Sequence, residues 1–186
     1  MSLLEDNVDQ AIATFERLRG MTPNLEAAAA SLTDTLARGG LVATGGNGGS
    51  AADAMHLATE LVCRFEKQRR AYPALCMNSS GGDLTAIAND FDYNRVFERQ
   101  VEAFCGPGDL VVLLSTSGNS PNVVRGLEAA SSCGAASLAL LGRDGGRAAG
   151  LADMELRVEG NSTARIQEAH KLLIHTLCGL VETAEP

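Results

Sequence analysis

The sequence predicts a single α/β domain over residues 1–186, with a five-stranded parallel, flavodoxin-like sheet flanked by helices. Three observations lead to this fold class. The chain has 186 residues, which suits one ordinary domain. Short apolar runs alternate with amphipathic segments from residue 41 onward, as in a parallel sheet covered on both faces. Two of those runs end in turns rich in glycine or hydroxyl residues, at the sheet edge where such folds bind ligands.

Residues 1–40 predict a pair of helices that precedes the 41–186 α/β core. Apolar residues recur at helical spacing in each: Val8, Ile12, Phe15 and Leu18, then Leu25, Ala29, Leu32 and Leu36. Gly20 with Pro23 separates the two stripes, and Gly39-Gly40 ends the second. The pair forms either an extra layer or a contact between subunits. Because it has its own apolar stripes outside the sheet, we expect the contact between subunits.

The core is predicted as alternating strands and helices. The expected strands are 41–44, 74–77, 109–115, 136–141 and 154–158. The expected helices are 50–65, 83–88, 94–104, 121–132, 146–151 and 164–183.

Composition excludes several classes of protein. Hydrophobic residues make up 45% of the chain, so it can form a core, and its formal charge of −8 would repel nucleic acid. The apolar runs are much shorter than the roughly 20 residues that cross a bilayer. The start, MSLLEDNVDQ, lacks the basic and apolar regions of a secretory signal, and the five cysteines show no CxxC spacing. We therefore expect a cytoplasmic protein with reduced thiols and no membrane or nucleic-acid partner.

A glycine-rich turn at 44–50, Thr-Gly-Gly-Asn-Gly-Gly-Ser, follows the first predicted strand and opens a helix. Glycines there let the backbone approach a ligand, and the helix start offers unpaired N–H groups to an anion. Gly46, Gly48 and Ala51 fit a relaxed dinucleotide spacing, but Met77-Asn78 ends the next strand without the acidic residue that binds a ribose. A tight turn explains some of the glycines; four around one Asn favour ligand contact.

A second polar turn at 115–120, Ser-Thr-Ser-Gly-Asn-Ser, lies between a strand and a helix opened by Pro121. Hydroxyls and exposed N–H groups can hold a phosphate without Lys or Arg. One of these side chains is needed as a helix cap, and the others indicate a phosphate cradle.

The three histidines complete the set of candidate residues. His56 and Glu60 are spaced i, i+4 on one predicted helix, and Gln167, His170 and His175 lie on the last one. Taken alone, each cluster is explained better by a structural role than by metal binding or catalysis. The basic run Arg64, Arg69 and Arg70 is interpreted as a solvated surface, and Asp144-Gly145-Gly146 as a turn.

These motifs together resemble the phosphoheptose isomerase family of the sugar-isomerase (SIS) fold. The resemblance rests on motifs spread in order over essentially the whole chain: Gly46–Ser50 as Gly-Asn-Gly-Gly-Ser, Asp53-Ala54-Met55-His56 with Glu60, Asn89-Asp90-Phe91, the 115–120 turn, Asp144-Gly145-Gly146, and Arg165-Ile166-Gln167-Glu168 with His175.

The resemblance implies an isomerase that converts sedoheptulose 7-phosphate into D-glycero-D-manno-heptose 7-phosphate for ADP-heptose and lipopolysaccharide synthesis. It implies a homotetramer with active sites shared between subunits, and one zinc ion per site held by His56, Glu60, Gln167 and His175. It also implies substrate contacts at Asn47, Gly48, Gly49, Ser50, Glu60, Asn89, Asp90, Ser115, Thr116, Ser117, Ser120 and Gln167.

Aldose–ketose chemistry assigns roles to two of these residues. Moving a carbonyl between C1 and C2 through an enediol needs a base for the carbon-bound proton and an acid for the oxygens. Glu60 is the natural base and His175 the natural acid. A carboxylate bound tightly to zinc is a poorer base, so either Glu60 leaves the metal during turnover or the zinc is partly structural. The sequence leaves both open.

The spacing of Gln167 and His175 has a geometric consequence. Eight residues on one straight helix are separated by about 12 Å of rise and about 80° of rotation. Ligands of one zinc ion must lie closer together, since each is roughly 2.0–2.2 Å from the metal. We therefore expect one of the two to come from a neighbouring subunit.

Two other functions remain as alternatives. Some relatives of this fold are non-catalytic tetramers that bind the replication initiator protein; they share the glycine turn and the Ala-Arg-Ile-Gln stretch at 164–167. That branch lacks the residues matching Glu60 and His175, so their presence here favours an enzyme. An isomerase or sensor of another sugar phosphate would share the phosphate cradle.

Overall fold

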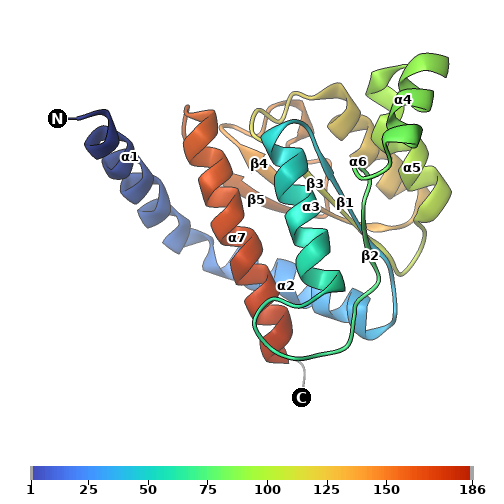
Figure 1. Cartoon of the computed structure of the whole chain (residues 1–186), viewed down its shortest axis with the longest axis horizontal. Coiled ribbons are helices and arrows are strands. Elements are labelled where there is room, and N and C mark those ends of the chain that lie inside the picture. The colour runs from blue at the N-terminus through green and yellow to red at the C-terminus, as the bar shows by residue number, and fades with distance from the viewer. Residues whose placement is uncertain (1, 185–186) are drawn as a thin grey trace.

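The computed structural model describes residues 2–184 as one α/β domain; residues 1, 185 and 186 of the predicted domain lie outside it. Its five strands form one parallel sheet in the order β2-β1-β3-β4-β5, as the sequence predicts (Figure 1). The strands are β1 (Val42–Gly46), β2 (Ala74–Cys76), β3 (Leu110–Ser115), β4 (Ala136–Gly142) and β5 (Met154–Val158).

Seven α-helices and three short 3-10 helices surround the sheet within the described residues. The α-helices are α1 (Leu3–Leu18), α2 (Thr22–Ala37), α3 (Gly49–Val62), α4 (Gly81–Asp90), α5 (Val96–Phe104), α6 (Pro121–Cys133) and α7 (Thr163–Ala184). The 3-10 helices are η1 (Arg19–Met21), η2 (Tyr93–Arg95) and η3 (Gly146–Ala148). No helix in the described part of the chain is long and apolar enough to span a membrane.

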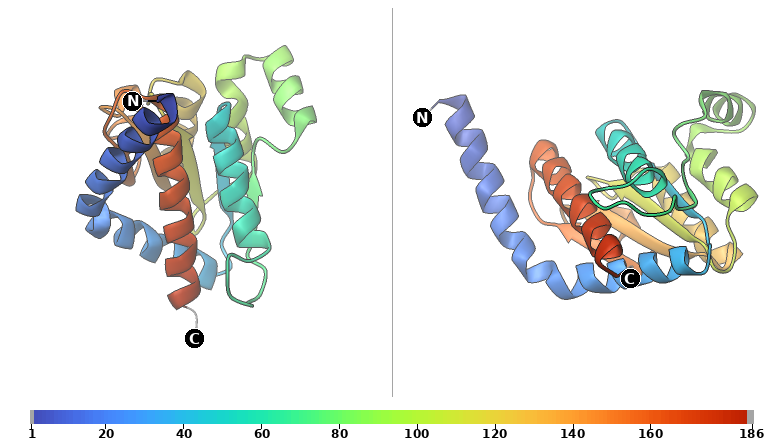
Figure 2. Two further views of the ribbon diagram at one scale, coloured as in Figure 1. Left: turned by 60° about the vertical axis from the view of Figure 1, so that its left-hand side comes forward. Right: turned by 60° about the horizontal axis from the view of Figure 1, so that its bottom comes forward.

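The sheet is covered on both faces, and its central strands are therefore buried and mostly apolar. Every residue of β1 and β3 is buried. Along β3 the side chains alternate, so Leu110 and Leu114 join one core cluster whereas Val111 and Leu113 join the other. Helices α2, α3 and α7 cover the first face, and α5 and α6 cover the second, as the two views of Figure 2 show.

The strand order places a topological switch point beside β1. The chain passes from β1 to β2 on one side, and β3 then pairs with β1 on the other. In an open parallel sheet, ligands bind at the carboxyl ends of the strands flanking such a point. Gly46 at the end of β1 is in register with Leu114 of β3, so both polar turns start at the same sheet edge.

The N-terminal helix α1 projects away from the α/β core (Figure 1). It begins with a capping box formed by Ser2 and Glu5. Two long-range bonds connect it to the core: Arg165 donates to the carbonyl of Asn7, and Arg17 donates to the carbonyl of Glu159. Much of its surface therefore remains exposed in the single chain.

The prediction of a helix at residues 146–151 is wrong. The structure has only the 3-10 turn η3 there, followed by irregular backbone. Gly145, Gly146 and Gly150 all adopt positive φ, of 86°, 53° and 79°. That left-handed conformation interrupts an α-helix, and glycine adopts it without the steric cost that other residues meet.

We predict that Gly40→Ala lowers the free energy of unfolding by about 1–3 kcal/mol, because overpacking strains the fold. A Cβ at this position, just before β1, would lie 2.1 Å from the carbonyl oxygen of Gly108, a backbone atom that cannot swing away. Urea denaturation at a fixed protein concentration measures the change.

Gly20→Ala is the matched control, since no atom lies within 4 Å of its added Cβ. Its unfolding free energy should stay within about 0.5 kcal/mol of the wild type or rise slightly. Equal losses in both variants would contradict the steric explanation.

Candidate active site

The glycine-rich turn after β1 forms an open backbone surface at the start of α3. Gly48 is the N-cap of α3 with φ +56°, and it has no side chain to occupy the first amides of the helix. A Cβ on Gly46 would lie 2.7 Å from the carbonyl oxygen of Ser50, so the turn is too tight for any other residue there. The turn therefore presents main-chain N–H groups at a helix start, an arrangement that suits an anion or a polyhydroxy ligand.

Asn47 in this turn is fixed by side chains that the sequence did not single out. Its amide and that of Asn122 exchange two hydrogen bonds, each of 2.9 Å, and the hydroxyl of Tyr93 donates to Asn47 Oδ1 at 3.0 Å. Asn122 is 2% exposed and also accepts the backbone N–H of Val123. The reciprocal amide pair ties the glycine turn to the first turn of α6.

Asn78 supports the same turn from the neighbouring strand. Its side-chain amide donates to the carbonyl of Gly46 at 2.9 Å, and the N–H of Gly46 donates back to Asn78 Oδ1 at 3.1 Å. Sequence analysis used this residue only to exclude a dinucleotide site. Its position directly after β2, beside a glycine turn, was the available signal.

The second polar turn, after β3, leaves hydroxyl groups available. Ser120 is the N-cap of α6, but its side chain makes no capping hydrogen bond, so the hydroxyl expected to cap this helix is not used for that purpose. Ser115 Oγ accepts the N–H of Gly118 at 3.1 Å and lies 3.4 Å from Ser120 Oγ. Hydroxyls and the start of α6 thus converge at one point, as expected of a phosphate cradle.

The Asp144-Gly145-Gly146 turn braces this cradle, and it is a turn as predicted. The N–H of Arg147 donates to Asn119 Oδ1 at 3.1 Å, and the N–H of Ala148 donates to the carbonyl of Gly118 at 2.9 Å. Gly118 itself has φ +63° and packs directly against the carbonyl of Gly145.

The predicted substrate residues Asn89 and Asp90 end α4 and are exposed. The amide of Asn89 donates to Asp90 at 2.8 Å. Asp90 is three residues and Asn89 four residues before Tyr93, whose hydroxyl donates to Asn47.

Three of the four predicted metal ligands meet where α3 and α7 lie side by side. His56 Nε2 lies 2.9 Å from His175 Nε2 and 3.3 Å from Glu60 Oε1. All three side chains are only partly buried. Burial lowers the pKa of His56 and the nearby charge of Lys171 lowers it further, although Glu60 opposes both.

Gln167 lies elsewhere in the same chain. Its side chain sits against Gly49, where a Cβ would be 2.3 Å from Gln167 Nε2. Gly49 precedes His56 by seven residues on α3, which is about 10 Å of helix rise. Within one chain, Gln167 therefore lies apart from the His56–Glu60–His175 cluster, in agreement with the helix-spacing argument. The source of the fourth ligand stays a prediction.

Three other residues singled out by the sequence or close to the site lie in defined environments. His170 is fully buried; its Nε2 lies 3.1 Å from the carbonyl oxygen of Leu141, and its Nδ1 has no hydrogen-bond partner among the described residues. Lys171 forms an ion pair of 2.8 Å with Asp53, which sequence analysis did not anticipate. Arg69 was interpreted as solvated, and this was wrong: its side chain is 4% exposed and bonded to Glu182.

The cluster on α3 and α7 has the donor types that zinc prefers. Within residues 2–184 no group of three or more His, Cys, Asp or Glu side chains is arranged as a metal site. Tetrahedral zinc, with donors about 2.0–2.2 Å away, holds neighbouring donor atoms about 3.3 Å apart. The His56–Glu60 distance of 3.3 Å has this value, whereas the 2.9 Å between the two imidazoles is a hydrogen-bond distance. A small separation of the imidazoles would make the set fit zinc.

Comparison with known proteins identifies the family. A family model of the SIS domain matches residues 7–142. Phosphoheptose isomerase from Citrifermentans bemidjiense is 48% identical over 162 residues, which cover 87% of this chain and 84% of the relative. The chain belongs to the phosphoheptose isomerase family.

Solved phosphoheptose isomerase structures agree with the fold described above. The enzyme from Neisseria gonorrhoeae superposes with a TM-score of 0.92 at 35% identity, covering 97% of both chains. That from Francisella tularensis superposes with a TM-score of 0.89 at 29% identity, covering 98% of this chain and all of the other. The expected fold and family are therefore confirmed.

We predict that Gly118→Ala weakens binding of the sugar phosphate, raising KM roughly tenfold, which corresponds to about 1.4 kcal/mol. The added Cβ would overlap the carbonyl of Gly145 and push the 115–120 turn away from the turn that braces it. Steady-state kinetics of phosphoheptose isomerisation measures this.

Gly150→Ala serves as the control, because Gly150 also has positive φ, +79°, but open space around its Cβ position. It carries the same left-handed strain of about 1–2 kcal/mol. The control should lose stability while keeping KM. A raised KM in both variants would mean that strain alone, not the cradle, is responsible.

Proposed function

We propose that this chain is an isomerase of sedoheptulose 7-phosphate, which it converts into D-glycero-D-manno-heptose 7-phosphate through an enediol. The observation that carries the proposal is that Glu60 and His175, one on α3 and one on α7, both lie within 3.3 Å of His56. A carboxylate of α3, the helix that begins at the glycine turn, is thereby brought together with an imidazole of α7. Membership of the phosphoheptose isomerase family supports the substrate.

The proposed binding mode uses the two turns at the carboxyl ends of β1 and β3. The hydroxyls and amides at the start of α6 hold the phosphate, and the glycine turn with Gln167 holds the sugar chain. The residues proposed to contact substrate are Asn47, Gly48, Gly49, Ser50, Glu60, Asn89, Asp90, Ser115, Thr116, Ser117, Ser120 and Gln167.

The proposed chemistry needs one base and one acid. Glu60 removes the proton from C1 of the ketose and returns a proton to C2, and His175 serves the oxygens as the carbonyl moves. His56 lies against both residues and keeps them on one side of the substrate. The non-catalytic alternative has no use for this pair of residues.

We further propose that zinc is held by His56, Glu60 and His175, with Gln167 of a neighbouring subunit as the fourth ligand. When bound, zinc would polarise the substrate carbonyl and stabilise negative charge on its oxygen. The donor types support this assignment, as does the separation between Gln167 and the cluster within one chain.

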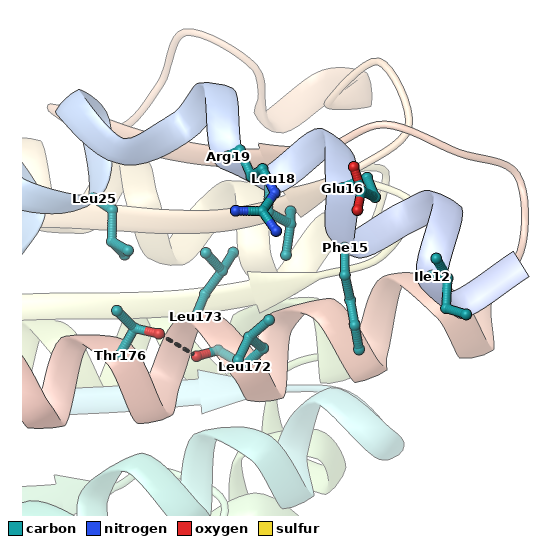
Figure 3. Close-up of a pocket in the computed structure, with 9 residues that line it drawn as sticks. All are labelled: Ile12, Phe15, Glu16, Leu18, Arg19, Leu25, Leu172, Leu173 and Thr176. Carbon is teal, nitrogen blue, oxygen red and sulfur yellow. Dashed lines mark hydrogen bonds between the residues drawn. The ribbon is translucent and has the colours of Figure 1, made fainter. Parts of the chain in front are cut away.

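A homotetramer with shared sites is proposed because Gln167 lies apart from the other three proposed ligands within one chain. The exposed surface of α1 supports it as well. The apolar stripe of α1 is exposed in the single chain: Leu4 by 72%, Ile12 by 54% and Phe15 by 37%. A groove of about 560 Å³ runs between α1, α2 and α7, and Figure 3 shows Phe15 extending across it toward α7. Neither polar turn lines this groove, which fits subunit packing better than substrate binding.

The proposed cellular setting is the cytoplasm, where the product would enter ADP-heptose synthesis for lipopolysaccharide. All five cysteines are free, consistent with a reducing compartment.

Replacing either proposed catalytic residue should abolish most activity. We predict that Glu60→Gln and His175→Gln each lower kcat for sedoheptulose 7-phosphate by about 10²- to 10⁴-fold, since each removes a proton-transfer group. The assay follows formation of the heptose phosphate by NMR, with and without added zinc.

Glu26→Gln, on the exposed side of α2, is the control and should keep full activity. A folded wild type with zinc that does not turn over this substrate would contradict the proposal and favour another sugar phosphate or the partner-binding branch.

Assembly should depend on the apolar face of α1. We predict that Ile12→Glu shifts the protein from tetramers to smaller species, because it places a charge in a face that subunits would bury. Ile12→Leu keeps the face apolar and should stay tetrameric. Analytical ultracentrifugation distinguishes the two, and a tetrameric Ile12→Glu variant would exclude this face from the interface.

A further inference from the structure

One carboxylate organises the segment that follows α3. Glu182, near the end of α7, accepts the N–H groups of Phe65, Glu66 and Lys67 at 2.8–2.9 Å. Its fourth donor is Arg69 Nε at 3.2 Å. Burial raises the pKa of Glu182, but these donors outweigh it, so the pKa lies below its usual range and the group stays charged. Figures 1 and 2 show this segment lying beside the last turns of α7 before the chain returns to β2.

The partner residue, Arg69, closes the end of α3. Its Nη2 donates to the carbonyl of Glu60 at 2.5 Å, and its Nη1 donates to the carbonyl of Leu61 at 2.9 Å. These are two of the last carbonyls of α3, which have no partner within the helix. The guanidinium also lies 4.2 Å from the ring centroid of Tyr72. These contacts depend on the planar, forked shape of the guanidinium, and the single ammonium group of a lysine could not reproduce them.

The two residues join the two helices that carry the site. Arg69 holds the turn of α3 from which Glu60 projects, and Glu182 belongs to α7, two turns after His175. The side chains of Arg69 and Glu182 are only 4% and 3% exposed, so the pair is fixed rather than fluctuating in solvent.

Phe65 extends this connection to His175 itself. Its N–H is held by Glu182, and its ring stacks on the His175 imidazole with a centroid separation of 5.5 Å and an interplanar angle of 25°. The same ring lies over Gly179, where even a Cβ would be in contact at 3.8 Å. The orientation of His175 toward His56 therefore depends on where Glu182 places the backbone of Phe65.

A purely stabilising role explains this arrangement poorly. Burying an ion pair costs desolvation that the attraction need not recover, and apolar replacements often stabilise a protein as well. Four donors on one carboxylate instead define a single geometry, and that geometry fixes both the base and the acid of the proposed reaction.

We propose that Arg69 and Glu182 are a positioning pair for isomerisation, which sets the placement of Glu60 on α3 and of His175 on α7 without touching substrate. This inference rests on the proposed function. The pair acts on kcat rather than on substrate binding, because the phosphate cradle lies at the start of α6 and has no contact with it.

The test compares Glu182→Gln, Arg69→Lys and Phe65→Leu with the wild type. Glu182→Gln removes acceptors, Arg69→Lys keeps the charge but loses the bonds to Glu60 and Leu61, and Phe65→Leu keeps every backbone bond while removing the stack on His175. Each variant should lose kcat by about 10- to 100-fold with KM unchanged within about twofold, as expected when a catalytic group is misplaced by about 1 Å. Glu182→Gln and Phe65→Leu should be non-additive in the double variant, since both act through His175.

Asp109→Asn is the matched control. Asp109 also accepts two backbone amides, those of Leu41 and Gly106, but these bonds hold the segments before β1 and β3 and not α3 or α7. It should lose thermal stability like Glu182→Gln and keep its kcat. If Glu182→Gln also keeps its kcat within twofold, the pair is structural only and the proposal is overturned.

A second readout separates this inference from the proposed function. In protein labelled with ¹³C at histidine, the ring signal of His175 should shift in Glu182→Gln, and that of His170 should not. This comparison needs no turnover, so it tests positioning even if the wild type were inactive on the chosen substrate. An unchanged His175 signal would overturn the proposal.

Discussion

The parallel pairing of β1 with β3 is the constraint on which the rest of the structure depends. Their register brings Gly46 beside Leu114, so two turns that are about 70 residues apart in sequence start at one sheet edge. Both helices that follow, α3 and α6, begin at that edge with no side chain bonded as a cap. Two helix starts thus face one region, and their dipoles favour an anion there before any charged side chain is considered.

Polar side chains convert this backbone arrangement into a defined site. Asn47 and Asn122 exchange two amide hydrogen bonds across the switch point, and Asn78 holds the peptide of Gly46 from the other side. Amides paired in this way are satisfied only in one relative placement of the strands. Deeper along α3, where it packs on α7, the imidazoles and the carboxylate meet. The glycine turn and the cluster of His56, Glu60 and His175 therefore both involve α3, the turn at its start and the cluster at its later turns.

The sequence predicts the fold well because the strands, helices and turns each follow from patterns of neighbouring residues. Apolar runs in fully buried strands and amphipathic stripes in helices are visible within a few residues, and so are the turns at 44–50 and 115–120. The helix expected at 146–151 failed because glycines that adopt positive φ are compatible with an apolar pattern but not with a helix. The convergence of His56, Glu60 and His175 was expected only from resemblance, since no local pattern relates α3 to α7.

The residues that support the site were harder to find from sequence. Asn122 acts on Asn47 over 75 positions, and the meaning of Arg69 depends on Glu182, 113 positions away. A basic residue in a polar segment resembles solvated surface until its partner is placed. Such pairings follow from tertiary packing, which propensity and periodicity do not encode.

Isotope exchange tests the central claim, proton transfer through an enediol, most directly. The enzyme would be run on sedoheptulose 7-phosphate in D₂O and the product examined by NMR. Proton abstraction by Glu60 predicts deuterium at C2 of the heptose phosphate, because the base exchanges its proton with solvent before returning it. Product formed at full rate with only hydrogen at C2 would mean that the hydrogen leaving C1 is the one delivered to C2 without exchange, and it would contradict this account of an exchanging base.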